Sequence, residues 1–586
     1  MNRQWFINRT NPEFVNYISR NTSTSYVLAQ ILINRGLKTI AGINDFLNPG
    51  RTCLSDPFDL PGMHAAIERI KAAMTMDERV IVHGDYDADG LTATSILLHA
   101  LRKVNIKADF FIPNRIEHGY GFNPPFIEAA KKCGARLIIT VDCGISSFEA
   151  VERAKAEGID VIITDHHEPA KQPAAASPQS KKDEGPGSGN HFLLPGALAV
   201  INPKLDPCNI KLWNLSGAGI AFKIAQAMAI DKDLPFTEDD SMSLLDLACL
   251  GTIADVVAIT GENRTLIKEG LCHISSSVRP GIKALKEVAG LGKREIKAGL
   301  LSFTLIPRIN AAGRIGDATE VVNLFLSDSP ELASSIAVKL DSTNIERQRI
   351  EEEAYQEAMA QLNSKGYDSA IVLHNKGWNP GVIGIVASRI AEEFYRPVFI
   401  FSVEGNTARG SARSIPAFNV YEGLSACRDI LISFGGHRQA AGIRLETPNL
   451  SLFEKRINSI VKDTLSSEDF TPAVEIDASV SLSGINNNFL KELSLLEPFG
   501  YGNPEPLLGS KKIEIMNPRV VGKNHLKMRL RQGHQSIDAI GFDMGGLLEG
   551  LGGFTFADAA FTPTINEWNH SRTLQLNIRA LRPSSS

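Results

Sequence analysis

The stretch VIVHGDYDADGLTATSILLHALRKV, residues 80–104, decides the fold of the first half of the chain. It begins with the short β-branched run 80–82, which favours a buried strand. A polar, glycine-containing loop follows at 83–90. The next residues then place apolar side chains at the spacing of an amphipathic helix, at Ile96, Leu97, Ala100, Leu101 and Val104. A strand, a loop and a helix in this order predict an α/β unit with the loop at the carboxyl end of the strand.

The residues downstream repeat this alternation. Further strands are expected at 110–112, 137–141, 161–163 and 198–201, and the segment SSFEAVERAKAEG at 146–158 is typical of a helix entered by a serine. Short apolar runs separated by helices predict a parallel sheet covered on both faces.

The chain has 586 residues, which is too long for one core, so three or four domains are expected. Residues 1–60 are predicted to be a helical lead-in and 61–327 the first α/β domain. More than thirty residues without a helix breaker predict a long connecting helix at 328–366. A second α/β domain is expected at 367–465. Period-2 alternation in LKMRLR (526–531) and LQLNIRAL (574–581) then predicts a small antiparallel barrel within 466–586.

Composition excludes several classes of protein. Hydrophobic residues make up 43% and charged residues 22% of the chain, which is ordinary for a globular protein. The seven scattered cysteines argue against a zinc knuckle and against a disulfide framework. No signal peptide or bilayer-spanning run is found, so a cytoplasmic protein is expected. The net charge of −5 gives no global attraction for nucleic acid, so such binding would need local basic patches.

Residues 168–196 are rich in Pro, Ala, Ser, Lys and Gly, and they are predicted to be a flexible surface insertion. A lid over the neighbouring chemistry is the alternative to a tolerated loop insertion.

Carboxylates and histidines follow three of the predicted strands. Asp85, Asp87 and Asp89 follow the first strand, where a solvated acidic loop would be the alternative interpretation. Asp142 follows the strand at 137–141, and the triplet Asp165-His166-His167 follows the strand at 161–163. Because the carboxyl ends of parallel strands meet at one edge of a sheet, these side chains are expected to converge on a metal site.

Mixed carboxylate and imidazole ligands suit Mn²⁺ or Mg²⁺, and Mn²⁺ is favoured by the histidine. Four or more carboxylates are more than one ion needs, so two ions about 3.5–4 Å apart are expected, as in phosphoryl-transfer enzymes. No GxxxxGK[ST] loop is present, which excludes the P-loop machinery for ATP. The glycine-rich piece SGAGIAFK at 216–223 suits a helix entry, with its amides either near a phosphate or only packed.

The motifs resemble those of a known family. DYDADG (85–90), VDCG (141–144) and the Asp165-His166-His167 triplet resemble successive motifs of the DHH phosphoesterases. The segments RINAAGRIGDA (308–318), SFGGHRQAAG (433–442) and PFGYGNPEP (498–506), with the long helix and the terminal barrel, resemble the RecJ family in particular. The resemblance covers nearly the whole chain.

This resemblance implies a ligand set and roles for its members. Asp87, Asp89, Asp142 and His166 would be catalytic metal ligands, with Asp142 bridging the two ions. Asp255 would be a further ligand, although LLDLACLGTIADVVAI alone indicates only a buried helix. His83 matches a ligand histidine of some relatives. Asp85 would lie behind the ligands, and His167 would hold a substrate phosphate or orient a ligand.

The resemblance also implies contacts with DNA. Arg308, Asn310 and Arg314 would bind phosphates near the cleft. The second lobe would be a DHHA1 domain that grips the terminal nucleotide through Arg409, Ser411, Arg413, Gly435, Gly436 and His437. The barrel would be an OB-fold whose Lys527, Arg529 and Arg531 track a single-stranded backbone, and a merely solubilising basic face is the alternative.

The predicted fold is therefore a parallel-sheet DHH domain, a long helix, an α/β DHHA1 domain and a C-terminal OB-fold. The resemblance implies a monomeric 5′-to-3′ exonuclease that threads single-stranded DNA between two lobes and releases 5′-mononucleotides in recombination and repair. A RecQ-type helicase and a single-strand-binding protein are partners by resemblance, and no extra C-terminal domain is expected. Two rivals remain: a phosphodiesterase acting on nanoRNA, cyclic dinucleotides or pyrophosphate, and an inactive DHH scaffold of replication.

Overall fold

A parallel sheet of five strands carries the motif-bearing loops. The strand order is β3-β2-β4-β5-β8, and β2 pairs in register with β4 through Ile81↔Ile138. Every pairing in the sheet is parallel, as the short apolar runs predicted. The strands are β2 (Arg79–His83), β3 (Lys107–Phe111), β4 (Ala135–Val141), β5 (Asp160–Thr164) and β8 (Ala199–Ile201).

The structure is a computed structural model that describes residues 4–114, 121–171, 192–292, 294–551, 556–568 and 571–584. The chain divides into two compact units. The first unit comprises Leu37–Asn344 and Leu493–Glu505. The second unit comprises Met1–Gly36, Ile345–Glu492 and Pro506–Ser586.

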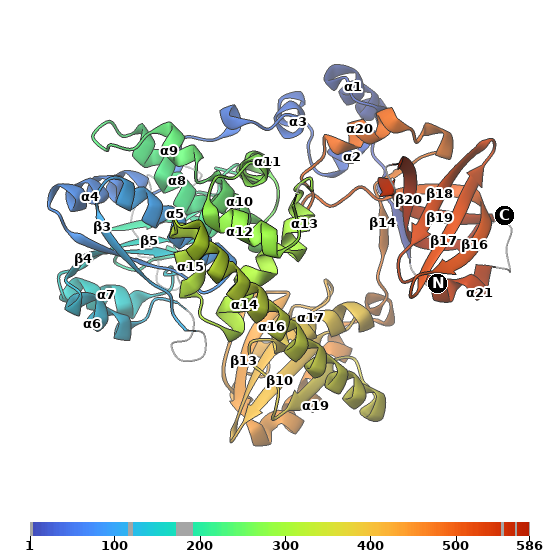
Figure 1. Ribbon diagram of the computed structural model, residues 1–586. Coiled ribbons are helices and arrows are strands. Elements are labelled where there is room, and N and C mark those ends of the chain that lie inside the picture. The colour runs from blue at the N-terminus through green and yellow to red at the C-terminus, as the bar shows by residue number, and fades with distance from the viewer. Residues whose placement is uncertain are drawn as a thin grey trace, which may run out of the picture. The chain divides into compact units, whose positions relative to one another are not determined.

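Helices cover both faces of the parallel sheet, because the strand side chains that alternate along each strand are apolar on both sides. On one face, Val80, Val82 and Ile139 pack against α4, α5 and α8; on the other, Ile81 and Ile138 pack against α6 and α7. Figure 1 shows these helices around the sheet. Their bounds are α4 (Met63–Thr75), α5 (Ala88–Lys103), α6 (Pro124–Lys132), α7 (Phe148–Ala156) and α8 (Gly217–Ile230).

The rest of the first unit is helical and extends the core around α5. It consists of α3 (Ile40–Leu47), α9 (Glu238–Met242), α10 (Leu245–Ala254), α11 (Gly261–Ser275), α12 (Pro280–Val288), α13 (Ala298–Phe303), α14 (Leu305–Ile315) and α15 (Thr319–Leu326). Within the described residues, no helix is both long enough and apolar enough to cross a membrane.

The long helix expected from the sequence is α16 (Pro330–Lys365), and the boundary between the units falls within it. Its first part adds Ala337 and Leu340 to the core of the first unit. Its second part adds Tyr355 and Leu362 to a core of the second unit.

The second unit contains a five-stranded sheet of order β12-β13-β11-β10-β9, in which only β9 and β10 pair in parallel. One face of the strands β9 and β10 packs against α16 and α17, while the opposite face of the sheet packs against α18 and α19. The bounds are β9 (Ile371–Asn375), α17 (Ile383–Phe394), β10 (Val398–Glu404), β11 (Thr407–Arg413), α18 (Val420–Ser425), β12 (Leu431–Gly436), β13 (Ala440–Glu446) and α19 (Leu450–Thr464).

The predicted barrel closes through the order β16-β17-β18-β20-β19, with β19 returning to β16. Leu526, Met528 and Leu530 are buried inside it, as their alternation predicted. It is not wholly antiparallel, because β18 and β20 pair in parallel. The remaining elements are β14 (Val474–Ile476), β15 (Ala478–Ser479), α20 (Asn487–Ser494), β16 (Leu508–Val521), β17 (His525–Gln532), β18 (Gln535–Gly541), α21 (Leu548–Leu551), β19 (Phe556–Trp568) and β20 (Ser571–Pro583).

The N-terminal segment divides after Gly36, although the sequence indicated a single lead-in at 1–60. Residues up to Gly36 belong to the second unit, where β1 (Trp5–Ile7) pairs in parallel with β14 and precedes α1 (Pro12–Thr22) and α2 (Tyr26–Asn34). Strand pairing with a segment more than 450 residues away is not visible in local patterns.

The predicted flexible insertion at 168–196 lies mostly outside the described residues, which omit 172–191. Its two described ends pair as the short antiparallel strands β6 (Ala170–Lys171) and β7 (Phe192–Leu193).

Candidate metal centre and nucleic-acid contacts

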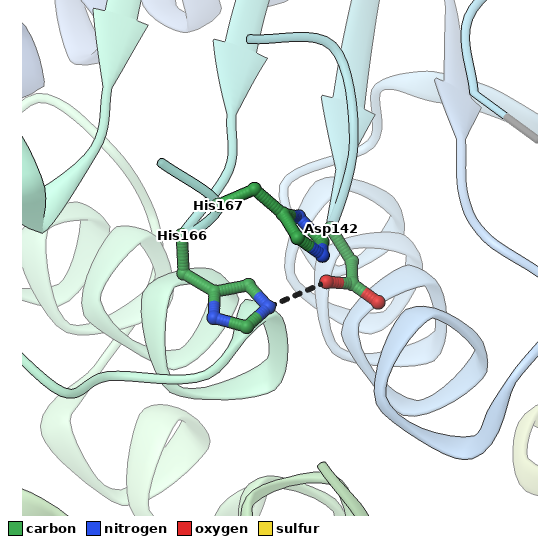
Figure 2. Close-up of side chains that lie close together, drawn as sticks. All are labelled: Asp142, His166 and His167. Carbon is green, nitrogen blue, oxygen red and sulfur yellow. Dashed lines mark ion pairs between the residues drawn. The ribbon is translucent and has the colours of Figure 1, made fainter. Parts of the chain in front are cut away.

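The acidic and histidine clusters that follow three strands lie together. The Nε2 atom of His166, two residues beyond β5, lies 3.0 Å from Oδ1 of Asp142, which follows β4 (Figure 2). Oδ2 of Asp89, in the first turn of α5, lies 4.0 Å from the same nitrogen. The strand ends therefore converge as the sequence analysis expected.

A helix end adds a further carboxylate to the cluster. Asp255 is the C-cap residue of α10, and its Oδ2 lies 3.5 Å from Nε2 of His166. Only the family resemblance pointed to Asp255, because the apolar helix that precedes it shows no signal of a site. The structure brings Asp255 into one group with Asp89 and His166.

Three sets of side chains could each hold a metal ion, because within each set the ligand-type atoms lie within 4.8 Å of one another. The sets are Asp142–His166–His167, Asp89–His166–Asp255 and Asp85–Asp87–Asp142. Asp142 and His166 each belong to two sets, so the sets form one continuous cluster. Among the residues that the structure describes, no other group of this kind occurs. The shared position of Asp142 suits a carboxylate that bridges two cations.

Burial makes this concentration of negative charge costly. Burial, with the nearby charges of Asp89 and Asp87, raises the pKa of Asp142 well above its usual value. Burial and the charge of Asp87 raise the pKa of Asp89 to about 7. Burial, followed by the charges of Asp89 and Asp87, likewise raises the pKa of Asp255. Carboxylates packed this closely ionise together only when a cation compensates their repulsion.

The donor atoms at the centre of the cluster fit divalent cations. Nε2 of His166 and Oδ2 of Asp255 are buried and make no hydrogen bond among the described residues. Burial and the neighbouring His167 lower the pKa of His166 to about 3, so its imidazole is neutral and keeps a lone pair for a cation. Carboxylate oxygens with one neutral imidazole form a donor set that suits Mn²⁺ and tolerates Mg²⁺.

The first turn of α8 fixes the carboxylate of Asp89. The N–H groups of Gly217 and Ala218 donate to its Oδ2 and Oδ1 at 2.6 and 2.9 Å. The positive end of a helix favours an anion, so the glycine-rich SGAGIAFK piece binds an anion of the protein itself. The sequence alone allowed these amides to bind a phosphate. It gave no sign of their contact with Asp89, because the two segments lie 128 residues apart.

Gly217 leaves no room for a side chain. A Cβ atom at this position would lie 2.6 Å from Cβ of Asp142 and 3.0 Å from Oδ2 of Asp89. We expect Gly217→Ala to push both carboxylates out of position and to lower kcat by at least about tenfold, because a misplacement of about 1 Å already costs up to a hundredfold. Steady-state hydrolysis of single-stranded DNA, the substrate that the resemblance implies, measures kcat of the purified variant, and circular dichroism checks that the variant is folded.

Gly299→Ala is the matched control, since a Cβ atom at Gly299 in α13 meets nothing within 4 Å. It should keep wild-type kcat and gain up to about 1 kcal/mol of stability from the better helix former. Equal kcat values for the two alanine variants would show that the close packing of Gly217 against the carboxylates does not matter for catalysis.

Two residues assigned to DNA contacts are instead engaged within the protein. Oδ1 of Asn310 accepts the N–H of Ala88 at 2.9 Å and thereby holds the start of α5. Arg308 forms an ion pair with Asp341 at 2.8 Å and donates to the carbonyl of Thr304. Both residues thus support the helices around the site, and their role as phosphate ligands stays a prediction. Arg314 lies half-buried in the last turn of α14.

The start of α5 also orients Asp87. Its Oδ1 accepts the N–H groups of Asp89 and Gly90 at 3.0 and 3.1 Å, so Asp87 is the N-cap residue of the helix. The cap fixes the rotamer of Asp87 beside Asp85 and Asp142.

His167 is held by its neighbour in the triplet. Its Nδ1 lies 2.7 Å from Oδ1 of buried Asp165, whose Oδ2 accepts the N–H of Ile145 at 2.9 Å. Burial would lower the pKa of His167, but the hydrogen bond and charge of Asp165 outweigh it and raise the pKa overall. A histidine that carries positive charge more readily and is partly exposed suits a contact with a substrate phosphate.

His83 does not join the cluster, so its predicted role as a ligand is not supported. Its ring is 1% exposed and packs against Phe111, Phe122 and Phe126. Its Nδ1 lies 3.7 Å from Sγ of Cys143. Burial lowers the pKa of His83 to about 3, as expected for a neutral core histidine.

In the second unit, strand register gathers the predicted nucleotide-binding residues on one face. Arg409, Ser411 and Arg413 alternate along β11 with buried alanines, so they share a side of the sheet. Nη1 of Arg413 donates to Oγ of Ser411 at 3.1 Å. Arg409 stands opposite Arg444 of β13, which sequence reasoning missed because the residue lies outside the glycine motif.

The glycine motif forms the hairpin beside these arginines. Gly435 pairs with Gly442, which pairs in turn with Ser411, so a row without large side chains crosses three strands. The N–H of His437 donates to the carbonyl of Ala440 at 2.8 Å and closes the turn after Gly436. Cationic side chains around exposed backbone are suited to sugar and phosphate groups.

The basic face of the barrel is partly neutralised. Arg529 pairs with Asp538 at 2.8 Å, and Arg531 pairs with Glu514. Lys527 stands opposite Arg519 of β16. Two of the three predicted cations therefore already have carboxylate partners on neighbouring strands, which lowers the positive potential that the sequence pattern indicated.

Comparisons with family models match three parts of the chain. The N-terminal domain of the DHH family matches residues 79–252, the DHHA1 domain matches residues 367–463, and the RecJ OB domain matches residues 476–580. Together they cover the sheet with the metal cluster, the mixed sheet and the barrel.

Two relatives that match most of the chain carry the name RecJ. The single-stranded-DNA-specific exonuclease RecJ of Bacillus subtilis is 37% identical over 98% of this chain and 70% of its own, and that of Escherichia coli is 34% identical over 89% and 91%. The crystal structure of RecJ in complex with Mn²⁺ from Thermus thermophilus matches with a TM-score of 0.83 and 30% identity, over 100% of this chain and 80% of that chain. The chain therefore belongs to the RecJ family of DHH phosphoesterases.

Proposed function

We propose that this protein is a metal-dependent exonuclease that hydrolyses the phosphodiesters of single-stranded DNA. The observation that carries the proposal is the buried cluster in which His166 lies within 4.0 Å of Asp89, Asp142 and Asp255. The relatives named above are single-stranded-DNA-specific exonucleases, and matched structures hold Mn²⁺ or Mg²⁺.

The chain's own residues would hold two cations and place the substrate. Bound cations would supply an activated water and would compensate the charge that develops on the phosphate oxygens. Asp142 would bridge them, while Asp87, Asp89, Asp255 and neutral His166 complete the set. His167, charged more readily because of Asp165, would hold a phosphate oxygen.

The face of β11 and β13 that carries Arg409 and Arg444 supports a grip on the end of the strand. Arg409, Arg413 and Arg444 bring three guanidiniums to a face that also carries Ser411. Like charges placed opposite each other across a sheet are unfavourable unless an anion lies between them. A phosphate bound at this face would relieve the repulsion between Arg409 and Arg444.

Polarity and product form the finer part of the proposal: hydrolysis from the 5′ end with release of 5′-mononucleotides. Single-stranded DNA labelled at the 5′ or the 3′ end is incubated with the protein and Mn²⁺. Immediate release of a 5′-labelled mononucleotide, with the 3′ label staying on long products until late, is the expected result. Early release of the 3′ label would reverse the assigned polarity, and internal fragments would contradict an exonuclease.

Both rivals make different predictions. A phosphodiesterase for short oligonucleotides or cyclic dinucleotides would cleave these at least as fast as a long strand, and the match of the RecJ OB domain to residues 476–580 favours the long strand. An inactive scaffold should lack cation ligands, whereas the expected carboxylates and His166 are all present and gathered here.

Partners other than DNA remain predictions from the family. These are a RecQ-type helicase and a single-strand-binding protein that would supply the substrate, a monomeric state, and a place in recombination and repair.

A further inference from the structure

A short loop of the first unit lies against the segment that follows Asp255. This loop, residues 498–503, belongs to the stretch Leu493–Glu505 that is grouped with the first unit. The N–H of Ile259 donates to the carbonyl of Tyr501 at 2.8 Å. Gly500 and Asn503 exchange backbone hydrogen bonds at 3.0 and 3.1 Å, which closes the loop on itself.

The interior of the loop is rigidly held. Asn503 is fully buried, and its Nδ2 donates to the carbonyls of Leu496 and Pro498, both at 2.8 Å. At Gly500 a Cβ atom would lie 2.4 Å from Cδ1 of Ile259, so only glycine permits this close approach. The loop is therefore packed tightly on the chain four residues beyond a cation ligand.

This rigid loop displays an aromatic side chain. Tyr501 is 66% exposed, and Val256, directly after Asp255, is 65% exposed. Val256 has a φ of 57°, a left-handed conformation that a β-branched residue adopts only at a cost of about 1–3 kcal/mol. Single exposed apolar residues are ordinary, but an exposed aromatic residue on a rigid loop, together with a strained valine directly after Asp255, points to a ligand surface.

We propose that Tyr501 stacks on a base of the bound strand within a few nucleotides of the scissile phosphate, with Val256 as the second wall of this contact. Four residues span at most about 14 Å, so the backbone to which Tyr501 bonds lies within a few nucleotides of the cation ligands. Every base has a π face, so an aromatic platform binds single strands without sequence preference. This inference rests on the proposed function and names one residue that positions its substrate.

The test measures binding apart from catalysis. Tyr501→Ala, Tyr501→Phe and wild type are titrated with a 5′-phosphorylated oligonucleotide of about 20 nucleotides in EDTA, and Kd is read by fluorescence anisotropy. Loss of one base stack weakens Tyr501→Ala about tenfold, whereas Tyr501→Phe keeps the ring and the wild-type Kd. Tyr17→Ala, which removes a 53% exposed tyrosine of α1, is the matched control and should leave Kd unchanged.

Oligonucleotides with a single abasic site then locate the stacked base. One position among the first five nucleotides should weaken the wild type as much as Tyr501→Ala does, and at that position the variant should lose nothing more. In Mn²⁺ the same variant should raise KM more than it lowers kcat.

Equal Kd values for wild type and Tyr501→Ala would overturn the inference. If the wild type still hydrolysed single-stranded DNA in that case, the proposed function would stand. Equal losses in Tyr501→Phe and Tyr501→Ala would also overturn it, because the hydroxyl rather than the ring would then bind. Failure of the wild type to hydrolyse any strand would count against the proposed function instead.

Discussion

Asp142→Asn is expected to lower kcat for single-stranded DNA by at least about 1,000-fold, because cations contribute several kcal/mol to such transition states and each 1.4 kcal/mol is a factor of ten. Asp142 belongs to two of the three ligand sets and lies 3.0 Å from His166, so its charge serves the whole cluster. Asparagine is the right replacement, since Asp142 has a φ of 59° and asparagine tolerates this left-handed conformation.

The same substitution should stabilise the protein when cations are absent. Burial and the charges of Asp89 and Asp87 raise the pKa of Asp142, so this carboxyl costs stability at neutral pH, where the unfolded chain ionises it freely and the folded chain resists ionisation. Asparagine removes this charge, and we expect a higher Tm in EDTA. The rise in Tm that Mn²⁺ gives the wild type should shrink or vanish in the variant.

Asp109→Asn is the matched control, because Asp109 lies on the same sheet with a 62% exposed side chain. It should change neither kcat nor the response of Tm to Mn²⁺. A fully active Asp142→Asn variant would contradict the assignment of the cluster as the reaction centre, and a lower Tm in EDTA would contradict the electrostatic explanation.

Arg264→Ala should destabilise the first unit by about 3–5 kcal/mol, as expected when a buried charged hydrogen-bond network is broken. The Arg264 side chain is almost wholly buried, and its guanidinium lies 3.9 Å from the ring centroid of Phe46. It donates to five carbonyl oxygens, at distances from 2.7 to 3.5 Å, of Phe46, Leu495, Leu496, Glu497 and Pro498. Alanine removes this donor from the carbonyls of Phe46, Leu495 and Glu497, whereas Asn503 still donates to those of Leu496 and Pro498.

The stretch Leu493–Glu505 should respond first, because Arg264 is its main polar anchor in the first unit. Limited proteolysis should cut the variant within this stretch at protease levels that leave the wild type intact, and the midpoint of thermal unfolding should fall. Arg264→Lys keeps the charge but offers three donors without the planar fork, so an intermediate loss is expected.

Arg294→Ala removes an exposed arginine of the same unit and should stay within about 0.5 kcal/mol of wild type. An Arg264→Ala variant that unfolds at the wild-type midpoint and resists protease equally would contradict this prediction. It would mean that the carbonyl oxygens to which Arg264 donates do not depend on its side chain.

Local sequence patterns were sufficient to predict the strands and helices whose buried side chains recur at regular spacing. The strands β2, β4 and β5 and the helix α5 could be predicted because β-branched runs and helical spacing arise from the residues themselves. The convergence of Asp142 and His166 followed from topology, since parallel strands place their carboxyl ends at one edge.

The missed features all depend on contacts between distant segments. Asp255 follows an apolar helix and looks like an ordinary helix end until His166 approaches it. Arg264 has the sequence context of a surface arginine, and its burial depends on carbonyls more than 230 residues away. The partners that Asn310 and His83 have within the protein, the α5 backbone and three phenylalanines, could likewise not be seen in the sequence.

Initial rates on one DNA sequence, offered as a single strand and as a blunt duplex, test the central claim most directly. The protein is assayed on both substrates with Mn²⁺ and again with excess EDTA, and released mononucleotides are counted. We predict rapid release from the single strand only, and none from either substrate in EDTA. Equal rates on duplex and single strand, or release that persists in EDTA, would contradict a metal-dependent exonuclease specific for single-stranded DNA.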